Sequence, residues 1–278
     1  MISTIRLLKD TLLKADKILV GAGAGLSTSA GFEYGGSAFM RNFSYMFERY
    51  GYTDMYSAGF HPFENEREKW WYWSYFIFLN RYATGAMPLY EELFSLLKQK
   101  DYFVLTTNVD HQFQKAGFDK KRLFYTQGDY GLFQCEEPCH KQAYDNEEIV
   151  RKMIAGSRDH KIPEELIPRC PRCGRKMTIN LRADNRFVED EGWKMACRRY
   201  KEFLRGMEGR RCLLLELGVG YNTPGIIKYP FWGMTNENPD FTYACLNMDE
   251  PYVPKEIRSK SLLIQGDIKE SIETLLSL

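Results

Sequence analysis

A glycine-rich stretch early in the chain, residues 17–31, restricts the possible folds more than any other feature. It reads K-I-L-V-G-A-G-A-G-L-S-T-S-A-G, so three apolar residues precede a run of glycines. A short apolar run is typical of a buried parallel strand, and glycines without a Cβ allow backbone N–H groups to surround a phosphate. The stretch therefore favours a strand and a turn that binds a dinucleotide pyrophosphate. A tight strand-to-helix turn without a ligand is the alternative, because Leu26 and Thr28 stand where a third fingerprint glycine belongs.

Length and composition narrow the class of protein. A chain of 278 residues, 44% of them hydrophobic, can form one large domain, or a large domain with a small appendage. Its 38 basic and 37 acidic residues leave no net charge to attract nucleic acid or anionic lipid. The N-terminus lacks a signal-peptide pattern, and the most apolar stretch, 70–79, is too short to cross a bilayer. We therefore expect a cytoplasmic protein that binds neither nucleic acid nor membranes.

Short apolar runs recur along the chain between amphipathic segments. Beyond the first run, they predict strands at 102–106, 123–125, 212–217, 242–246 and 261–264. Helical periodicity predicts helices over 2–15, from residue 88, over 191–207 and at the C-terminus. This alternation is typical of an α/β, Rossmann-like fold with an open parallel sheet. Small or polar residues follow nearly every strand, at the edge where such sheets bind ligands.

Residues 33–87, approximately, interrupt the alternation. The segment mixes charged and aromatic residues, including K-W-W-Y-W at 69–73, and predicts an inserted helical module. Its aromatic side chains are expected to pack a core, and the alternative is an apolar wall for a cofactor or acyl-type substrate. The expected Rossmann-like domain comprises 1–132 and 181–278, and a small zinc-binding domain comprises 133–180.

Four cysteines predict the metal in the small domain. Cys135 and Cys139 form one close pair, and Cys170 and Cys173 form another within a Cys-x-x-Cys-Gly knuckle. Two such pairs are typical of tetrahedral zinc, and four sulfur ligands leave no open position, so the metal is expected to be structural. His140 is an alternative ligand beside the first pair.

Several motifs, in this order and spacing, resemble those of the sirtuins over nearly the whole chain. Residues 23–32, G-A-G-L-S-T-S-A-G-F, resemble the sirtuin opening G-A-G-x-S-x-x-x-G-I, and residues 107–110, T-N-V-D, resemble Q-N-I-D. Gln127-Gly128 stands where sirtuins carry His-Gly, and the two cysteine pairs follow. Three late motifs complete the resemblance, at residues 218–220, Asn247 and residues 266–268.

The resemblance implies that NAD binds at the strand ends and that zinc holds the small domain. It implies Asn108 beside the nicotinamide ribose, Asp110 beside the carboxamide and Asn247 near the adenosine ribose. The residues that it implies for NAD binding are Gly23, Ala24, Gly25, Leu26, Ser27, Gly31, Phe32, Asn108, Val109, Asp110, Gln127, Gly218, Val219, Gly220, Asn222, Asn247, Met248, Asp249, Asp267 and Ile268.

Departures from the sirtuin pattern fall where the chemistry takes place. Residues 33–36, E-Y-G-G, replace P-D-F-R, Gln127 replaces the catalytic histidine, and residues 181–189 replace a phenylalanine-glycine-glutamate segment. These departures resemble the macrodomain-associated microbial branch, class M. That branch is associated with protein ADP-ribosylation and with lipoyl-carrier proteins, such as glycine-cleavage H-like proteins. The resemblance therefore implies a protein substrate of this kind and an operon-linked macrodomain partner.

Gln127 changes which reactions are accessible. Glutamine has no group that titrates near neutral pH, so it cannot be the general base of sirtuin deacylation. An acidic acceptor is already anionic and can attack the ribose carbon without losing a proton. We expect a protein mono-ADP-ribosyltransferase; the alternatives are an NAD-dependent lysine deacylase and a catalytically inactive NAD- or carrier-binding module.

The expected catalytic residues are Asn108, Gln127 and Arg182. Gln127 is expected to hold the ribose or the acceptor by hydrogen bonds. Arg182 is expected to orient an incoming carboxylate through a bidentate pair. A solvated arginine beside Arg186 is the alternative interpretation of Arg182.

Overall fold

The computed structural model describes residues 2–278, which divide into two compact units. The first unit comprises the described residues up to Gly31, together with Ala86–Gln127 and Glu191–Leu278. The second comprises Phe32–Gly85 and Gly128–Asp190, so the aromatic segment and the four cysteines fall in one unit. The domain boundaries expected from the sequence, after residues 132 and 180, lie inside this second unit.

A six-stranded parallel sheet forms the centre of the first unit. Its order is β3-β2-β1-β7-β8-β9, and every neighbouring pair is parallel. The strands are β1 Lys17–Ala22, β2 Tyr102–Thr106, β3 Leu123–Tyr125, β7 Cys212–Leu217, β8 Phe241–Asn247 and β9 Ser261–Gln265. Each predicted apolar run forms one of these strands, so the Rossmann-like α/β prediction is confirmed. The chain order reverses between β1 and β7, the point at which such sheets bind ligands.

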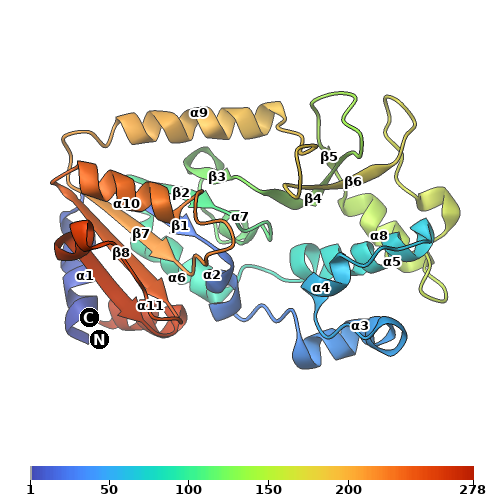
Figure 1. Cartoon of the computed structure of the whole chain (residues 1–278), viewed down its shortest axis with the longest axis horizontal. Coiled ribbons are helices and arrows are strands. Elements are labelled where there is room, and N and C mark those ends of the chain that lie inside the picture. The colour runs from blue at the N-terminus through green and yellow to red at the C-terminus, as the bar shows by residue number, and fades with distance from the viewer. Residues whose placement is uncertain (1) are drawn as a thin grey trace. The chain divides into compact units, whose positions relative to one another are not determined.

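Helices cover both faces of this sheet (Figure 1). One face packs against α1 Ile2–Lys14, α6 Pro88–Leu97 and α11 Ile268–Ser277, and the other against α9 Glu191–Arg205 and α10 Lys228–Glu237. Side chains alternate between the two faces along each strand. In β1, Ile18 and Val20 pack in the apolar cluster with α1, α6 and α11, and Leu19 packs in the cluster with α9 and α10. The unit also contains α2 Ala24–Ser29, α7 Gln112–Lys115 and the 3-10 turns η2 Lys120–Arg122 and η4 Lys255–Lys260.

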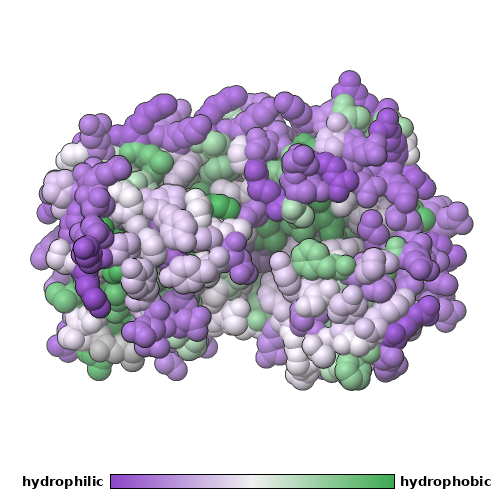
Figure 2. All heavy atoms as spheres, viewed as in Figure 1, coloured by the Kyte–Doolittle hydropathy of each residue, from purple (hydrophilic) through white to green (hydrophobic). Residues whose placement is uncertain are grey.

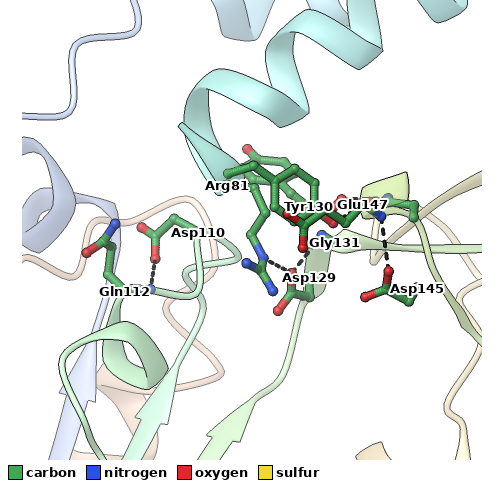
Figure 3. A network of polar contacts seen from close by, with 10 residues as sticks. Arg81, Asp110, Gln112, Asp129, Tyr130, Gly131, Asp145 and Glu147 are labelled. Carbon is green, nitrogen blue, oxygen red and sulfur yellow. Dashed lines mark hydrogen bonds and ion pairs between the residues drawn. The ribbon is translucent and has the colours of Figure 1, made fainter. Parts of the chain in front are cut away.

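The second unit packs helices against a small antiparallel sheet. The sheet order is β5-β4-β6, with β4 Gly128–Cys135, β5 Tyr144–Asp145 and β6 Met177–Leu181. The helical segments are α3 Gly36–Tyr50, α4 Met55–Gly59, α5 Glu66–Ile77, the π-helix η1 Phe78–Tyr82, α8 Glu147–Gly156 and the 3-10 turn η3 Glu164–Leu166. Arg81 donates from Nε to the Asp129 carboxylate at 2.8 Å, and the Gly131 N–H donates to the same oxygen at 2.7 Å (Figure 3). These bonds tie η1 to the start of β4.

Aromatic side chains supply much of the interior of the second unit. Trp70, Tyr72 and Phe43 are at most 1% exposed, and the rings of Phe43 and Tyr72 lie 4.9 Å apart. The aromatic run at 69–73 therefore contributes to a packed core. None of the described helices, in either unit, is long and apolar enough to span a membrane.

Candidate functional site

A cavity of about 410 Å³ opens in the first unit at the carboxyl ends of its strands. Segments that follow β1, β2, β3, β7 and β8 all contribute to its wall. The lining residues are Gly23, Ala24, Gly25, Thr107, Gln127, Gly218, Val219, Gly220, Tyr221, Asn222, Thr223, Lys228, Asn247, Asp249, Glu250, Pro251 and Tyr252. Sequence reasoning missed Lys228, Glu250 and Tyr252, because no recognisable motif contains them.

The glycines after β1 allow that loop to pack directly on the loop after β7. A Cβ on Gly25 would lie 2.8 Å from the Cα of Gly218. A Cβ on Gly218, whose φ is +61°, would lie 2.4 Å from the backbone nitrogen of Leu26. The N–H groups of Gly23 and Gly25 donate to the carbonyl oxygens of Leu217 and Gly218 at 3.0 and 2.9 Å. These two N–H groups therefore hold the loops together, and the glycines give the cavity a floor of bare backbone.

Asn108 and Asp110 lie in a polar network beside this floor. Asn108 donates from Nδ2 to the Gly23 carbonyl oxygen and to Ser27 Oγ, both at 3.0 Å. Ser27 Oγ donates to the Asp110 carboxylate at 2.6 Å, and the Tyr90 hydroxyl lies 2.9 Å from the same Oγ. The network fixes the orientation of the Asn108 amide. Sequence reasoning missed Tyr90, because its ring belongs to the apolar face of α6 and nothing in that pattern indicates a role for its hydroxyl.

The Asp110 carboxylate is fixed a second time by its own loop. It accepts the backbone N–H of Gln112 at 3.0 Å, as Figure 3 shows, and Asp110 is only 3% exposed. A short side chain that bonds the backbone two residues later stabilises a local turn. Asp110 therefore has a structural function in this loop.

Gln127 follows β3 and lines the cavity. Its Oε1 atom is buried, and no described residue donates a hydrogen bond to it. A buried acceptor without a partner costs about 1–3 kcal/mol. A donor group of a bound molecule would therefore stabilise this arrangement.

Lys228 places a buried cation at the cavity wall. Its side chain is 3% exposed, and its ammonium donates to the carboxylate of the fully buried Glu216. Tyr243 donates to the other oxygen of Glu216 at 2.7 Å, and burial raises the pKa of the Tyr243 hydroxyl far above its usual value. The Lys228 ammonium also lies 5.1 Å from the centre of the Tyr221 ring. The positive charge is thus matched inside the protein.

Other residues expected at the site lie outside the lining of this cavity. Leu26 and Ile268 are 0% and 2% exposed and belong to the apolar core. Asp267 caps the N-terminus of α11 and accepts the Ser29 hydroxyl at 2.9 Å. The remaining residues that were expected to bind NAD and do not line the cavity belong to loops; they are Gly31, Phe32, Val109 and Met248.

Arg182 belongs to the second unit and lies on its surface. It donates to Glu189 at 2.6 Å, and its guanidinium lies 4.5 Å from the centre of the Phe187 ring. Arg186, also exposed, pairs with Asp184 at 2.7 Å. The two arginines therefore have different partners, although only four positions separate them.

The four cysteines of the second unit converge. Their sulfur atoms all lie within 4.8 Å of one another, with Cys135 and Cys173 at 3.7 Å and Cys139 and Cys170 at 3.7 Å. Zn–S bonds of about 2.3 Å in a tetrahedron require sulfurs roughly 3.8 Å apart. Burial opposes ionisation of Cys170, but backbone hydrogen bonds in the knuckle lower its pKa to about 7. The set fits a structural zinc ion, while the two ring nitrogens of His140 lie 3.0 Å from Cys139 Sγ and 2.7 Å from the Tyr144 hydroxyl.

Comparison with known proteins agrees with this geometry. No protein-family model matches the chain. A Sir2 structure bound to a propionylated peptide has a TM-score of 0.61 at 17% identity, covering 98% of this chain and 97% of that one. A Sir2 homologue in complex with NAD has a TM-score of 0.60 at 13% identity, covering 98% and 93%. The fold is therefore that of the sirtuins.

A sequence relative identifies the family. A Staphylococcus aureus protein named protein ADP-ribosyltransferase is 38% identical over 270 residues, which are 97% of this chain and 86% of that protein. This chain belongs to the sirtuin-type protein ADP-ribosyltransferases. A Fusarium oxysporum f. sp. cubense protein, named probable bifunctional ADP-ribose hydrolase/ADP-ribosyltransferase, is 33% identical over 98% of this chain and 48% of its own length.

No histidine of this sirtuin-type ADP-ribosyltransferase is among the described residues that line the cavity. His111 follows the Asn108 loop in the left-handed conformation, with φ of 66°. The other three, His61, His140 and His160, belong to the second unit. An amide, Gln127, is therefore present in the wall, and a side chain that titrates near neutral pH is not.

Proposed function

We propose that this chain transfers one ADP-ribose unit from NAD to a protein acceptor and releases nicotinamide. The observation that carries the proposal is Gln127, an amide with an unpaired buried oxygen in the wall of the strand-end cavity. The name of the S. aureus relative supports the transferase activity. The NAD complex of a Sir2 homologue supports the co-substrate.

The residues present fit NAD. The cavity has a floor of bare backbone, because a Cβ at Gly23 or Gly25 would collide with the backbone of the loop after β7 and force the two loops apart. Asn247 would bind the adenosine ribose, and its amide is oriented by a 3.2 Å bond to the Val219 carbonyl oxygen. Asn108 and the Asp110 network would bind the nicotinamide end. NAD supplies the ribose carbon that is transferred and the leaving group.

The transfer needs no general base when the acceptor is a carboxylate. An acceptor oxygen forms a bond to the ribose C1′, the bond from C1′ to the nicotinamide nitrogen breaks, and its electron pair leaves with nicotinamide. The carboxylate is ionised at neutral pH, so no proton has to move. Gln127 would hold a ribose hydroxyl, which donates to its free Oε1. Arg182 would exchange its bond with Glu189 for the acceptor carboxylate.

Deacylation is the rival activity, and the cavity wall argues against it. It requires a base to take a proton from a ribose hydroxyl, and losing such a base typically costs about 10²–10⁴-fold in rate. Gln127 cannot supply that base. A residual deacylase would form O-acyl-ADP-ribose from an acyl peptide.

The acceptor in this proposal is a lipoyl-carrier protein of the glycine-cleavage H type, as the class M resemblance implies. An ADP-ribose hydrolase of macrodomain type would remove the modification; the name of the Fusarium relative, which joins hydrolase and transferase, supports this pairing. Free cysteines at metal-ligand spacing support a reducing, cytoplasmic location.

The test combines labelled NAD with the carrier in lipoylated and unlipoylated form. Wild-type protein should label the carrier and release one nicotinamide per ADP-ribose transferred. Gln127→Ala should lower transfer by at least tenfold, whereas Gln127→His should leave more activity than alanine because a ring nitrogen can accept the same hydrogen bond. No label on either form, with NAD binding demonstrated by calorimetry, would refute the proposal.

A further inference from the structure

Tyr90 places a hydroxyl group in the interior of the first unit, in the first turn of α6. Polar groups are more common at the surface, where water satisfies them, and the face of the protein in Figure 2 is mainly hydrophilic. Tyr90 has no exposed surface, and its ring packs edge-on against that of Phe113, with ring centres 5.0 Å apart. A phenylalanine would supply this packing equally well. The hydroxyl therefore contributes something other than apolar contact.

The Tyr90 hydroxyl belongs to the network that surrounds Asn108. It lies 2.9 Å from Ser27 Oγ, and Asn108 Nδ2 donates to it at 3.3 Å. The three residues come from α6, from α2 and from the loop after β2, all in the first unit. Ser27 is only 2% exposed, so the protein itself must supply the hydrogen-bond partners of both hydroxyls.

Each hydrogen bond of this network can run in only one direction. The Gly23 carbonyl oxygen only accepts, so the Asn108 atom that lies 3.0 Å from it is the amide nitrogen. An ionised Asp110 carboxylate only accepts, so Ser27 donates its single proton there, at 2.6 Å. Ser27 Oγ is left with two lone pairs, and Asn108 Nδ2 donates to one of them at 3.0 Å. Tyr90 is therefore the donor in its bond to Ser27.

The Ser27 hydroxyl has no capacity left for a ligand. A serine hydroxyl offers one donor and two acceptor lone pairs. Asp110 takes the proton, and Asn108 and Tyr90 occupy the lone pairs. Any contribution of Ser27 to a bound molecule therefore passes through the residues that it orients.

The Asn108 side chain keeps its oxygen available for a ligand. One hydrogen of Nδ2 points to the Gly23 carbonyl oxygen, and the other is shared between Ser27 Oγ and the Tyr90 hydroxyl. No hydrogen bond among the described residues ends on Oδ1 of this half-buried side chain. Rotation of the amide by half a turn would place Oδ1 against the Gly23 carbonyl oxygen, where two acceptors repel. The partners of Nδ2 thus determine which atom the amide presents.

We infer that Tyr90 and Ser27 are positioning residues for ADP-ribosyl transfer, because they hold the Asn108 amide with its oxygen ready to accept a hydroxyl of the nicotinamide ribose. The presence of that ribose rests on the proposed function. Its two hydroxyls are both donors, and Gln127 Oε1 provides the second free acceptor. Gln127 and Asn108 follow the neighbouring parallel strands β3 and β2. Tyr90 and Ser27 act only through Asn108 and do not touch the substrate.

The kinetic test is Tyr90→Phe, which keeps the ring and removes the hydroxyl. At saturating NAD, kcat should fall about tenfold, because small displacements of a group that holds the reacting ribose are costly. The KM for the acceptor protein should stay within about twofold.

Tyr102→Phe is the matched control. Tyr102 is 3% exposed and lies at the opposite end of β2, and its hydroxyl accepts the Asp119 N–H at 3.3 Å. Both variants lose one buried hydroxyl and should lose similar stability in urea, but Tyr102→Phe should keep the wild-type kcat. An unchanged kcat for Tyr90→Phe, or an equal fall for both variants, would overturn the inference.

A double-mutant cycle tests the path from Tyr90 through Ser27. Ser27→Ala removes the acceptor of the Tyr90 proton. Tyr90→Phe should therefore lower kcat about tenfold in the wild-type background and less than about threefold in the Ser27→Ala background, since coupled residues are not additive. The same factor in both backgrounds would show that Tyr90 does not act through Ser27, and the inference would fail.

Binding of ADP-ribose and ADP separates this inference from the proposed function, because ADP lacks the second ribose and neither ligand requires turnover. In calorimetry, Tyr90→Phe should weaken ADP-ribose about fivefold, as expected for one displaced hydrogen bond, and leave the affinity for ADP unchanged. If this selective loss occurs but the wild-type protein transfers no ADP-ribose, the proposed function fails and the positioning role stands. If the wild-type protein transfers ADP-ribose and Tyr90→Phe matches it in kcat and in ADP-ribose affinity, the positioning role fails and the proposed function stands.

Discussion

The buried pair of Lys228 and Glu216 provides the sharpest test of how the first unit is stabilised. Glu216 lies in β7 with no exposed surface, and its carboxylate accepts from Lys228 and, at 2.7 Å, from Tyr243. Lys228→Met removes the only cation bonded to this carboxylate among the described residues and leaves a buried charge with two neutral donors, the Tyr243 hydroxyl and the Cys245 thiol at 3.4 Å. Loss of one partner of a buried pair costs about 3–5 kcal/mol. Lys228→Met should therefore lower the free energy of unfolding by about that amount.

Replacing the carboxylate in place of the cation should lower the free energy of unfolding by a smaller amount. Glu216→Gln leaves the Lys228 ammonium without its carboxylate, but the amide still accepts the Tyr243 hydroxyl. The ammonium also remains 5.1 Å from the Tyr221 ring, at the wall of a cavity that water can enter. We expect Glu216→Gln to lower the free energy of unfolding by about 1–3 kcal/mol, the usual cost of a broken buried hydrogen bond to a charged group.

The double change Lys228→Met with Glu216→Leu removes both charges at once. Buried ion pairs replaced by apolar residues are often neutral or more stable by about 1–4 kcal/mol. The double variant should thus regain most of the stability that Lys228→Met loses. The surface pair of Lys269 and Glu273, 3.8 Å apart with both side chains about half exposed, provides a control. Lys269→Met should change stability by no more than about 0.5 kcal/mol.

Urea unfolding, monitored by near-ultraviolet circular dichroism, measures all four variants. If Lys228→Met costs less than about 1 kcal/mol, the carboxylate has access to water and the burial argument is wrong. If the double variant is as unstable as Lys228→Met, the loss of stability comes from the packing of these side chains and not from their charges. Either result would refute the reasoning.

Three further predictions concern the two sites. Gly25→Ala should weaken ADP-ribose binding at least tenfold in calorimetry, because its Cβ would lie 2.8 Å from the backbone of the facing loop, whereas Gly220→Ala, with open space around its Cβ, should bind normally. Asp249→Asn combined with Glu250→Gln should reduce the preference for NAD over NADP about tenfold in competition binding, since these cavity-lining carboxylates repel a 2′-phosphate, each by roughly 1 kcal/mol at contact in water. A chelator should release one zinc ion per chain, measured by mass spectrometry of the metal, and Cys139→Ser should lower its affinity while ADP-ribose binding in the first unit persists.

The sheet of the first unit could be predicted because each of its strands is recognisable from residues that are adjacent in the sequence. Each strand is a short run of mostly apolar residues, buried on both faces in β1, β2 and β7 and partly exposed in the edge strand β9, with helical periodicity between the runs. The cysteine site could be predicted for a related reason, since pair spacing alone positions two ligands. Comparable local patterns exist for the ends of the strands, which is why Gln127 and Asn247 could be expected near a ligand.

The sheet of the second unit could not be predicted, because distant partners determine it. Strand β6 contains Asn180, which is 4% exposed and donates to Gln134 of β4 at 2.7 Å. Neither residue has a local partner, so the sequence alone suggests a polar loop. Glu216 is similar: a carboxylate within C-L-L-L-E-L indicates a buried partner, but nothing in the sequence identifies Lys228, twelve residues later, as that partner.

The charges around the strand-end cavity limit how this family member can hold NAD. Lys228 is the single cation among the described lining residues, and Glu216 already neutralises it. Asp249 and Glu250 add two carboxylates to the same wall. The pyrophosphate would then rely on backbone N–H groups other than those of Gly23 and Gly25, which hold the loops together, and on neutral side chains such as Asn222, because an ion pair would require breaking a buried one. Anchoring of the phosphates without ion pairs would suit a molecule that is cleaved and released in parts, since binding energy would then be available to the ribose, where the bond breaks.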